Sequence, residues 1–394
     1  MNKNAKGNQT PFKTIEFYNG SRSFKEQWPE LQIHLDKVME LGKFSHGKSI
    51  GFLEKAICDY TGARHAIAVN SATDALILLL RAAGIQPGDE VIVPCYTFFA
   101  SASSIVHAGG VPVFADVEPG SLTIDPNSVR KAITEKTKAI MPVHFLTQMA
   151  DMEAIQKIAD EYKLLVIEDS AQAIGMKFNG VHAGLLGMGG VLSFFPTKTL
   201  GALGDAGMIL TNNDELATQV SFTRHHGRTG ETIGHMPGIS HQAVFCGTNS
   251  KMDDIQAAVL LTRLKHLDNN ISKRAELANY YDNQLKTLNE VQIPKFVRNG
   301  LITNPVYYVY SIQAQKRDLL VKYLNSRGIA TEVYYPIPLH LQPCFKRFGY
   351  KTGDFPIAEA ASKSSVALPF YPDLSFEEAV YVCSTIKEFY QENK

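Results

Sequence analysis

The sequence predicts an α/β protein, in which helices sandwich a mostly parallel sheet and a smaller α+β domain follows at the C-terminal end. Two observations predict the sheet. Short apolar runs alternate with helical stretches from about residue 55 to 260, and several of these runs are apolar throughout. Continuously apolar strands are typical of parallel sheets, because helices cover both of their faces. Beyond residue 291 the spacing of apolar residues changes, which indicates the second domain.

The elements of the large domain follow in chain order. Residues 1–11 are polar and lack periodicity, which predicts a disordered tail. Residues 24–60 have helical periodicity with an interruption at 42–51. Seven apolar runs then predict strands, at 66–69, 91–93, 112–114, 139–143, 164–167, 191–195 and 207–210. The segments between them predict crossover helices, such as 73–83 and 152–162.

The C-terminal part begins with a long helix. Its apolar stripe predicts a helix that continues to about residue 288 and links the two lobes, and the stripe consists of Ala257, Leu260, Leu261 and Leu264. The pattern beyond it predicts strands at 306–313 and 331–335 and helices at 318–327 and 376–390. We therefore divide the chain into the tail, a large domain of residues 12–265 and a small domain of residues 266–394.

The composition argues against several classes of protein. Lys+Arg 39 and Asp+Glu 39 balance in a chain of 394 residues, which disfavours nucleic acid or an anionic membrane as the main partner. No apolar run approaches the roughly 18–20 residues of a membrane span, and the polar start lacks the apolar segment of a secretory signal. Five scattered cysteines without a C-x-x-C pair disfavour a disulfide framework or a structural zinc site. We therefore expect a cytoplasmic enzyme without a metal site.

The first motif with chemical meaning lies where strand 66–69 runs into a helix. Ser71-x-x-Asp74 has the form of a capping box. Such a helix start offers free N–H groups and a positive dipole end, and the small side chains of Ser71, Ala72 and Thr73 let an anion approach. Taken alone, an ordinary capped helix is the simpler interpretation.

Two acidic residues, Glu168 and Asp169, lie at the carboxyl end of strand 164–167. Open α/β sheets bind their ligands at this end of the strands. An aspartate there has three open roles, because it can hold a metal, cap the next helix or pair with a protonated ring nitrogen.

Lys198 lies on the glycine-rich turn after strand 191–195. A lysine on a loop is ordinarily a solvated surface charge, but apolar residues flank this turn and the next strand starts at residue 207. Partial desolvation makes such an amine competent to form an imine. A helix start for a phosphate, an acid for a ring nitrogen and a buried lysine are together what pyridoxal phosphate (PLP) needs.

With these motifs in place, the sequence resembles the sugar aminotransferases of the DegT/DnrJ/EryC1/StrS family from about residue 42 to 374. The blocks that carry the resemblance are residues 70–76, 87–94, 168–172, 193–207, 249–258 and 335–340. The resemblance implies the PLP-dependent transferase fold of type I. It also implies a homodimer whose active sites are shared between the subunits.

The resemblance implies the following cofactor contacts. Lys198 corresponds to the family's Schiff-base lysine, and Asp169 to the partner of the pyridine nitrogen. Gln172 matches the residue that hydrogen-bonds the phenolic oxygen of PLP. Phe98 matches the aromatic residue that stacks on the pyridine ring. Without the resemblance, a core aromatic residue is the better interpretation of Phe98.

Further residues match contacts on the phosphate side of the cofactor. They are Ser71, Ala72 and Ser193. Asn249 matches an asparagine that reaches the phosphate from the neighbouring subunit. The alternative for Asn249 is a simple turn residue.

Candidate substrate residues also follow from the resemblance, and these are His144, Arg228, Lys251, Tyr334, Tyr335 and His340. The tyrosines and His340 fit a packing role equally well, and the run 224–228 also fits a solvated basic patch. Lys251 stands where many relatives have arginine. Because lysine cannot form the bidentate fork to phosphate or carboxylate, the acceptor is expected to differ from the common cases.

The expected function is a PLP-dependent aminotransferase of amino-sugar biosynthesis, which moves an amino group from an amino acid, L-glutamate with L-glutamine as the alternative, to a nucleotide-linked keto-sugar. One alternative acceptor is a cyclitol ketone. A PLP-dependent sugar dehydratase is a second alternative, but that branch has histidine in place of Lys198. A non-catalytic PLP-binding protein is the third, although this neutral chain shows no DNA-binding segment. A nicotinamide dehydrogenase fits poorly, because no G-x-G-x-x-G follows the first strand.

Overall fold

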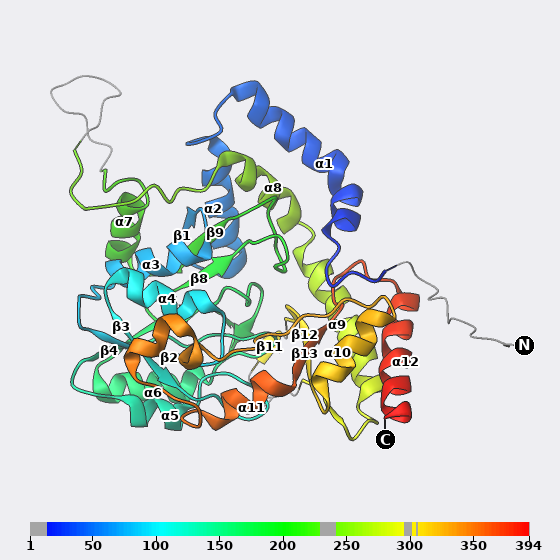
Figure 1. Cartoon of the computed structure of the whole chain (residues 1–394). Coiled ribbons are helices and arrows are strands. Elements are labelled where there is room, and N and C mark those ends of the chain that lie inside the picture. The colour runs from blue at the N-terminus through cyan, green and yellow to red at the C-terminus, as the bar shows by residue number, and fades with distance from the viewer. Residues whose placement is uncertain (1–13, 229–241, 295–301, 305, 394) are drawn as a thin grey trace, which may run out of the picture.

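A computed structural model of the chain describes residues 14–228, 242–294, 302–304 and 306–393. Its centre is a seven-stranded sheet with the strand order β1-β9-β8-β5-β4-β2-β3 (Figure 1). The strands are β1 (His65–Val69), β2 (Glu90–Pro94), β3 (Val111–Ala115), β4 (Thr137–Ile140), β5 (Leu165–Asp169), β8 (Gly189–Ser193) and β9 (Gly207–Thr211). All strand pairs are parallel except those of β9, which runs antiparallel to both β1 and β8. The predicted fold class and its seven strands are confirmed.

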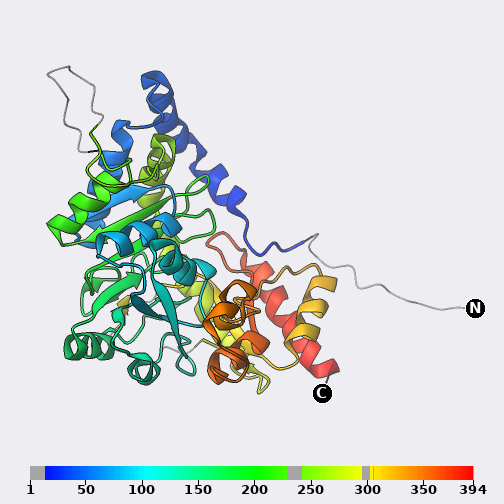
Figure 2. The same cartoon turned by 60° about the vertical axis from the view of Figure 1, so that its left-hand side comes forward.

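Helices cover both faces of this sheet, because alternate residues of each strand enter two different cores. Ile92 of β2 belongs to one core, whereas its neighbours Val91 and Val93 belong to the other. The first face is covered by α2 (Lys48–Thr61), α5 (Pro126–Ala132), α6 (Met152–Tyr162) and α8 (Asp254–Leu264). The second is covered by α3 (Ala72–Ala82), α4 (Phe99–Ala108) and α7 (Asp214–Thr223). Helix α1 (Gly20–Leu41) lies beside α8 at the edge of the molecule (Figures 1 and 2).

A third core lies in the C-terminal part, around a small antiparallel sheet of β10, β12 and β13. These strands are Val291–Gln292, Tyr310–Ala314 and Ser365–Leu368. The helices of this part are α9 (Leu267–Leu285), α10 (Arg317–Ser326) and α12 (Phe376–Glu392), which stand side by side in Figure 1. Ile15 joins this part through a bridge to Ile329.

The remaining elements are short. They are β6 (Lys177–Phe178), β7 (Val181–His182), β11 (Ile302–Asn304), the 3₁₀ helices η1 (Leu339–Leu341) and η2 (Pro343–Phe348), and α11 (Pro356–Ser364). Although η1, η2 and α11 belong to the C-terminal part of the chain, their apolar residues pack into the core beside α3 and α4. In the described ranges, no helix combines the length and apolar character needed to cross a bilayer.

Two elements differ from the sequence-based prediction. The long helix expected from Ala257 to residue 288 is interrupted at Lys265 and His266, whose N–H groups bond three residues back and close the last turn of α8. The interruption lets α8 pack on α1 and α2 while α9 packs on α12. The expected strand at 331–335 is reduced to an isolated bridge at Glu332. The carbonyl of Tyr334 and the N–H of Tyr335 instead bond to the hydroxyl of Tyr96, so they do not pair with a neighbouring strand.

The other predicted elements of the C-terminal part are present, but their ends are shifted. For example, the strand predicted from residue 306 begins at Tyr310. The tail predicted at residues 1–11 lies outside the described residues. The domain boundary near residue 265 stays a prediction.

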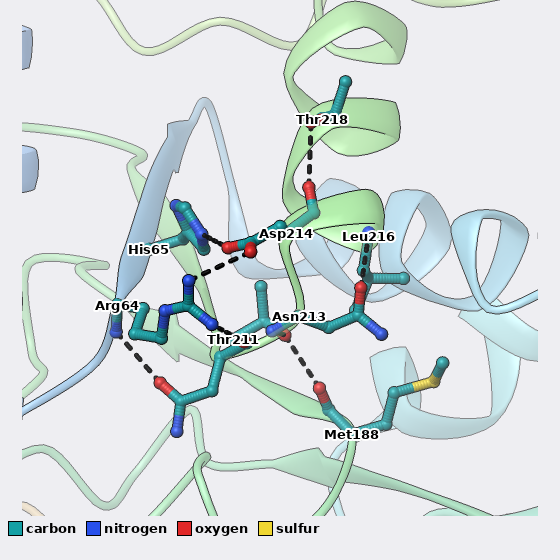
Figure 3. A network of polar contacts seen from close by, with 9 residues as sticks. Arg64, His65, Met188, Thr211, Asn213, Asp214, Leu216 and Thr218 are labelled. Carbon is teal, nitrogen blue, oxygen red and sulfur yellow. Dashed lines mark hydrogen bonds and ion pairs between the residues drawn. The ribbon is translucent and has the colours of Figure 1, made fainter.

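A closed polar network fixes the amino end of β1 (Figure 3). Asp214, at the start of α7, lies 2.6 Å from Nε2 of His65 and 2.9 Å from Nη2 of Arg64. Thr211 donates to the carbonyl of Met188 at 2.8 Å, which joins the end of β9 to the approach to β8. The hydrogen bond from His65 and the charge of Arg64 lower the pKa of Asp214.

Candidate active site

Strand register gathers several predicted site residues at one end of the large sheet. Gly207, the first residue of β9, pairs with Val69 at the end of β1 and with Ser193 at the end of β8. Asp169 ends β5, which lies next to β8. The turn to Ser71 therefore shares one edge of the sheet with Ser193 and Asp169, as expected for a ligand site in an open α/β fold.

The start of α3 forms an open cradle at this edge. The hydroxyl of Ser71 caps the helix by accepting from the N–H of Asp74 at 3.1 Å. The N–H groups of Ala72 and Thr73 have no acceptor among the described residues. A Cβ atom on Gly207 would lie 2.5 Å from the nitrogen of Ala72, so only glycine lets β9 approach the helix start this closely. Free N–H groups at a helix start with room in front of them fit a phosphate group.

The Asp169 side chain is held in place from both sides. The hydroxyl of Ser101 donates to Oδ2 at 2.7 Å, and the N–H of Ala171 donates to Oδ1 at 3.2 Å. Asp169 is 5 % exposed, so this carboxylate has one fixed orientation at the edge of the sheet. Ser101 was missed by the sequence analysis, because it lies 68 residues from Asp169 and only the fold brings the two together.

The neighbouring acid, Glu168, points to the opposite side of the strand and has a structural role. Its carboxylate lies 2.9 Å from Nε2 of His144 and accepts from the N–H groups of Gly184, Leu186 and Gly187 at 2.7–2.8 Å. Both side chains of the pair are fully buried. This arrangement gives no support to the predicted contact between His144 and substrate.

Gln172 extends the edge formed by Asp169. Its side-chain oxygen accepts from the N–H of Leu146 at 2.7 Å. That bond fixes the amide and leaves its NH₂ group as a donor, which has no acceptor in the part of the chain that the structure describes. A donor in this position fits the predicted contact with a phenolic oxygen.

Lys198 lies on a turn closed by a bond from its own N–H to the carbonyl of Phe195 at 2.8 Å. Its Nζ atom lies 4.1 Å from the centre of the Tyr308 ring. Within the described ranges, no carboxylate lies at ion-pair distance from this amino group. The amine of Lys198 is therefore held by an aromatic face and is free of a counter-ion.

Tyr308 is a residue of this site that the sequence analysis missed. Its hydroxyl oxygen lies 3.2 Å from Oγ1 of Thr197, the residue before Lys198. Burial raises the pKa of Tyr308, but Lys198, the hydroxyls of Thr197 and Tyr334, and Arg274 together lower it below its ordinary value. A run of tyrosines at 307–310 was the available signal, although spacing alone does not show which of them faces Lys198.

Tyr334, Tyr335 and Phe98 lie in the same aromatic group. The ring centres of Tyr334 and Tyr308 are 6.5 Å apart, and those of Phe98 and Tyr335 are 6.0 Å apart. The hydroxyl of Tyr96 donates to the carbonyl of Tyr334 and accepts from the N–H of Tyr335. Phe98 is 54 % exposed, so its ring is accessible to a flat ligand.

His340 is placed differently. It is 1 % exposed, its Nε2 lies 3.2 Å from a carboxylate oxygen of Glu359, and its ring packs against Phe355. Burial lowers the pKa of His340. The structure gives no support to the predicted contact between His340 and substrate.

The segment that carries Asn249 and Lys251 runs beside the start of α3, because Lys251 forms a bridge with Val69 and the hydroxyl of Ser250 donates to Asp74 at 2.6 Å. Lys251 and Arg228 make this region positively charged. Nζ of Lys251 donates to the side-chain oxygen of Asn249 at 2.5 Å, and Asn249 is exposed. A hollow of about 280 Å³ lies beside Lys251. A different hollow, of about 360 Å³, lies in another part of the molecule. His46, Arg224 and His225 also line the hollow beside Lys251.

The charges of this region repel one another. Burial lowers the pKa of Lys251, and the positive charges of Arg224 and Arg228 lower it further. Burial and neighbouring cations likewise lower the pKa of His225 to about 4. Arg224 is neutralised by Glu54 at 2.6 Å, whereas Lys251 is not paired with a carboxylate in the described part of the chain. Such a group of cations fits an anionic ligand.

The described residues include no cluster of three or more His, Cys, Asp or Glu side chains that could hold a metal ion. The polar groups at this edge of the sheet are instead the amine of Lys198, the carboxylate of Asp169 and the free N–H groups of the cradle at the start of α3.

Comparison with known proteins identifies the family. The model of the DegT/DnrJ/EryC1/StrS aminotransferase family matches residues 27–387. The chain is 46 % identical to a "pleiotropic regulatory protein" of Geobacillus stearothermophilus, over 94 % of this chain and 97 % of the relative. It is 35 % identical to the dTDP-3-amino-3,4,6-trideoxy-alpha-D-glucose transaminase of Streptomyces venezuelae, over 95 % of this chain and 96 % of the relative.

A solved structure agrees with this identification. The crystal structure of NtdA from Bacillus subtilis with bound cofactor PMP superposes with a TM-score of 0.86 and 34 % identity, covering 97 % of this chain and 87 % of NtdA. The matched regions include the whole edge that holds Lys198 and Asp169. The chain belongs to the DegT/DnrJ/EryC1/StrS aminotransferase family and is an aminotransferase.

Proposed function

We propose that this enzyme is a PLP-dependent aminotransferase that transfers an amino group from an amino acid to a keto-sugar. The observation that carries the proposal is the edge of the sheet where the Lys198 amine, the fixed Asp169 carboxylate and the open start of α3 occur together. The S. venezuelae relative is a transaminase of a nucleotide-linked sugar, and NtdA binds PMP.

Each group at the edge fits one part of PLP. Asp169 would hold the ring nitrogen, and Ser101 and Ala171 keep its carboxylate in the required orientation. The NH₂ group of Gln172 would donate to the phenolic oxygen, and the exposed face of Phe98 would stack on the ring.

The phosphate group would occupy the cradle at the start of α3. The free N–H group of Ala72, the hydroxyls of Ser71 and Ser193, and the absence of a side chain on Gly207 all fit this group. When bound, PLP supplies an electron-accepting ring that stabilises negative charge on the amino-bearing carbon.

Lys198 has two roles in this proposal. Its Nζ atom attaches the cofactor covalently, and after release it moves a proton to and from the amino-bearing carbon of the substrate. An amine without a carboxylate partner suits both roles, because no ion pair has to be broken before it reacts.

The substrates are inferred from the charges and rings near the edge. Tyr334 and Tyr335 offer hydroxyls and aromatic surface to a sugar ring. Lys251 and Arg228 would bind an anionic group, either a carboxylate of L-glutamate as donor or the diphosphate of a nucleotide-linked acceptor. Lysine meets phosphate as a point charge, without the fork of arginine.

We also propose that the enzyme is a homodimer in which Asn249 contributes to the phosphate site of the partner subunit. The exposed side chains of α1 and the following segment are rich in large apolar residues, namely Trp28, Ile33, Met39, Leu41, Phe44 and Phe52. Exposed large apolar side chains concentrated in one part of a chain are typical of association surfaces. Light scattering is expected to give twice the chain mass of 43.5 kDa, and Met39→Glu is expected to weaken the dimer.

The cysteines fit a cytoplasmic location. Cys246 and Cys344 are free and exposed in the described part of the chain. Exposed free thiols persist in a reducing compartment.

Visible absorption spectra test the proposed function. The wild-type protein loaded with PLP is expected to show the band of lysine-bound cofactor, and L-glutamate is expected to convert it to the band of the aminated cofactor. Lys198→Ala is expected to show neither band. A subsequent panel of nucleotide-linked keto-sugars, followed by mass spectrometry, identifies the acceptor.

Each other outcome changes the proposal in a defined way. If the cofactor band ignores L-glutamate and every other amino acid, the protein binds PLP without transferring an amino group. A cyclitol ketone that is aminated when no sugar is would change the acceptor class. A wild-type protein that does not bind PLP would contradict the proposal as a whole.

A further inference from the structure

We propose that the Lys198 amino group lies against the ring face of Tyr308 whenever it is not bonded to a cofactor. We call this position the seat of the amine. Tyr308 is then a positioning residue. The use of this seat in catalysis rests on the proposed function, in which Lys198 is repeatedly released as a free amine. The seat itself is a property of the chain alone.

The distance between the two groups carries the inference. Nζ of Lys198 lies 4.1 Å from the centre of the Tyr308 ring, well inside the range in which an aromatic face attracts an ammonium group. No described carboxylate competes for this amino group. The ring is therefore the group that holds the amine, and it does so without a counter-ion that would have to be removed later.

The backbone of Tyr308 is fixed by hydrogen bonds to two other segments of the chain. The N–H of Tyr308 donates to the carbonyl of Leu146 at 3.2 Å, and its carbonyl accepts from Nη1 of Arg274 at 2.9 Å. Arg274 is almost fully buried and also donates to the carbonyl of Phe370 at 3.2 Å. Tyr308 is 5 % exposed. Burial of this side chain, together with the contact between its hydroxyl and Thr197, restricts rotation of the ring away from Lys198.

The hydroxyl of Tyr308 also connects the ring to the lysine turn. It lies 3.2 Å from Oγ1 of Thr197, whose backbone continues directly into Lys198. The lowered pKa of Tyr308 agrees with a positive amino group close to this ring. A lysine side chain is long and loses much rotamer freedom when it is fixed. A ring that receives the released amine limits this freedom between steps.

Chemical reactivity of Lys198 in the PLP-free full-length protein tests the seat directly. Trace acetylation with acetic anhydride near neutral pH, quantified by peptide mass spectrometry, compares Lys198 with the other lysines of the same sample. Tyr308→Met removes the ring face and its attraction for the ammonium form. We expect the relative acetylation of Lys198 to rise by about 2–5-fold, the change that corresponds to an exposed to partly buried cation–π contact.

Two matched variants distinguish the seat from a loss of packing. Tyr308→Phe keeps the ring and removes the hydroxyl, so it is expected to leave the relative acetylation of Lys198 unchanged. Tyr307→Met removes the neighbouring buried ring, which packs on Phe370, and it is likewise expected to leave the relative acetylation of Lys198 unchanged. Circular dichroism establishes that each variant is folded, and Tyr308→Leu replaces Tyr308→Met if the latter does not fold.

Three results would overturn the inference. The first is an unchanged or lower acetylation of Lys198 in Tyr308→Met. The second is an equal rise in Tyr308→Phe, which would assign the effect to the hydroxyl. The third is an equal rise in Tyr307→Met, which would assign it to general loosening. The acetylation experiment uses no PLP. A failure of the proposed function would therefore be seen in the absorption spectra and would not change the acetylation result.

Discussion

The two ends of the large sheet use polar residues in opposite ways. At the amino end of β1, Arg64 and His65 both contact Asp214, so the polar groups of this network bond to one another (Figure 3). At the opposite end, the amine of Lys198 rests on an aromatic ring, and the NH₂ group of Gln172 has no acceptor among the described residues. The same strands therefore carry a closed network at one end and an open one at the other.

This difference separates stability from function. Polar groups that bond to one another contribute to folding, whereas donors left open lose that contribution and remain available to a ligand. The adjacent acids of β5, Glu168 and Asp169, show the same difference between a structural residue and a residue of the candidate site. Glu168 is fully bonded inside the protein, while Asp169 is held at the edge by Ser101 and Ala171. Substitutions at the closed end are expected to change stability alone, and those at the open end to change binding and catalysis.

The largest effect is expected from Lys198→Ala at the open end. Loss of the amine removes both covalent attachment of PLP and the proton transfer, so kcat is expected to fall on the order of 10³-fold or more. The melting temperature is expected to stay close to that of the wild type, because this amine has no described ion pair to lose. Steady-state kinetics and thermal unfolding measure the two quantities. A variant that keeps a tenth of the activity would contradict the role of Lys198.

Gly207→Ala is expected to close the cradle at the start of α3. The new Cβ would lie 2.5 Å from the nitrogen of Ala72, so β9 or α3 has to move. We expect a loss of about 1–3 kcal/mol in the free energy of unfolding, as for other overpacked sites. PLP is expected to bind more weakly, because the N–H groups that face its phosphate are displaced. Chemical denaturation and spectroscopic titration measure both effects.

The matched control for that change is Gly51→Ala. A Cβ on Gly51, inside α2, meets no atom within 4 Å, and alanine is the better helix former. This control is expected to stabilise the protein by about 0.5–1 kcal/mol and to leave PLP binding unchanged. Equal effects of the two substitutions would show that Gly207 has no special place in the cradle.

Ser101→Ala tests whether the hydrogen bond that holds Asp169 contributes to PLP binding at the open end. It removes the donor to Oδ2 of Asp169 and leaves the carboxylate in place. A hydrogen bond to a charged group contributes about 1.5–3 kcal/mol, so PLP affinity is expected to fall roughly tenfold or more. Ser104→Ala is the control, since the Ser104 hydroxyl bonds to a backbone carbonyl and not to Asp169. If both variants bind PLP equally well, Ser101 does not position the acid.

The sequence contains enough to predict the sheet and its chemistry but not the contacts between distant segments. Apolar runs predict all seven strands, because a parallel sheet buried on both faces requires them. The positions of Lys198 and Asp169 at the carboxyl ends of such strands were also predictable, because an apolar run precedes each of them. Their supports, Tyr308 and Ser101, were not, because they lie 110 and 68 residues away and reach the site through the fold.

The differences from the prediction have the same origin. His144 and His340 were predicted to contact substrate, yet each points toward a buried carboxylate, and the sequence does not show side-chain direction. The helix expected from residue 257 to 288 breaks at His266, which lets α8 pack on α1 and α2 while α9 packs on α12. Periodicity reports which residues are buried and not which core receives them.

The smallest effect is expected from Asp214→Asn at the closed end. His65 and Arg64 hold the pKa of Asp214 below its ordinary value in the folded protein, so the ionised carboxylate favours folding. This contribution is present above the ordinary carboxyl pKa of about 4 and is lost as the pH falls through the lower, folded value. At pH 7 the variant is expected to melt slightly below the wild type, and the difference is expected to vanish in acid and to shrink in high salt.

PLP binding and kcat are expected to be unchanged in Asp214→Asn. Asp59→Asn, which removes an exposed carboxylate paired with Lys55, serves as the control for the loss of one surface charge. A change in PLP affinity on Asp214→Asn would show that the two ends of the sheet are coupled, and the separation of stability from function would then fail.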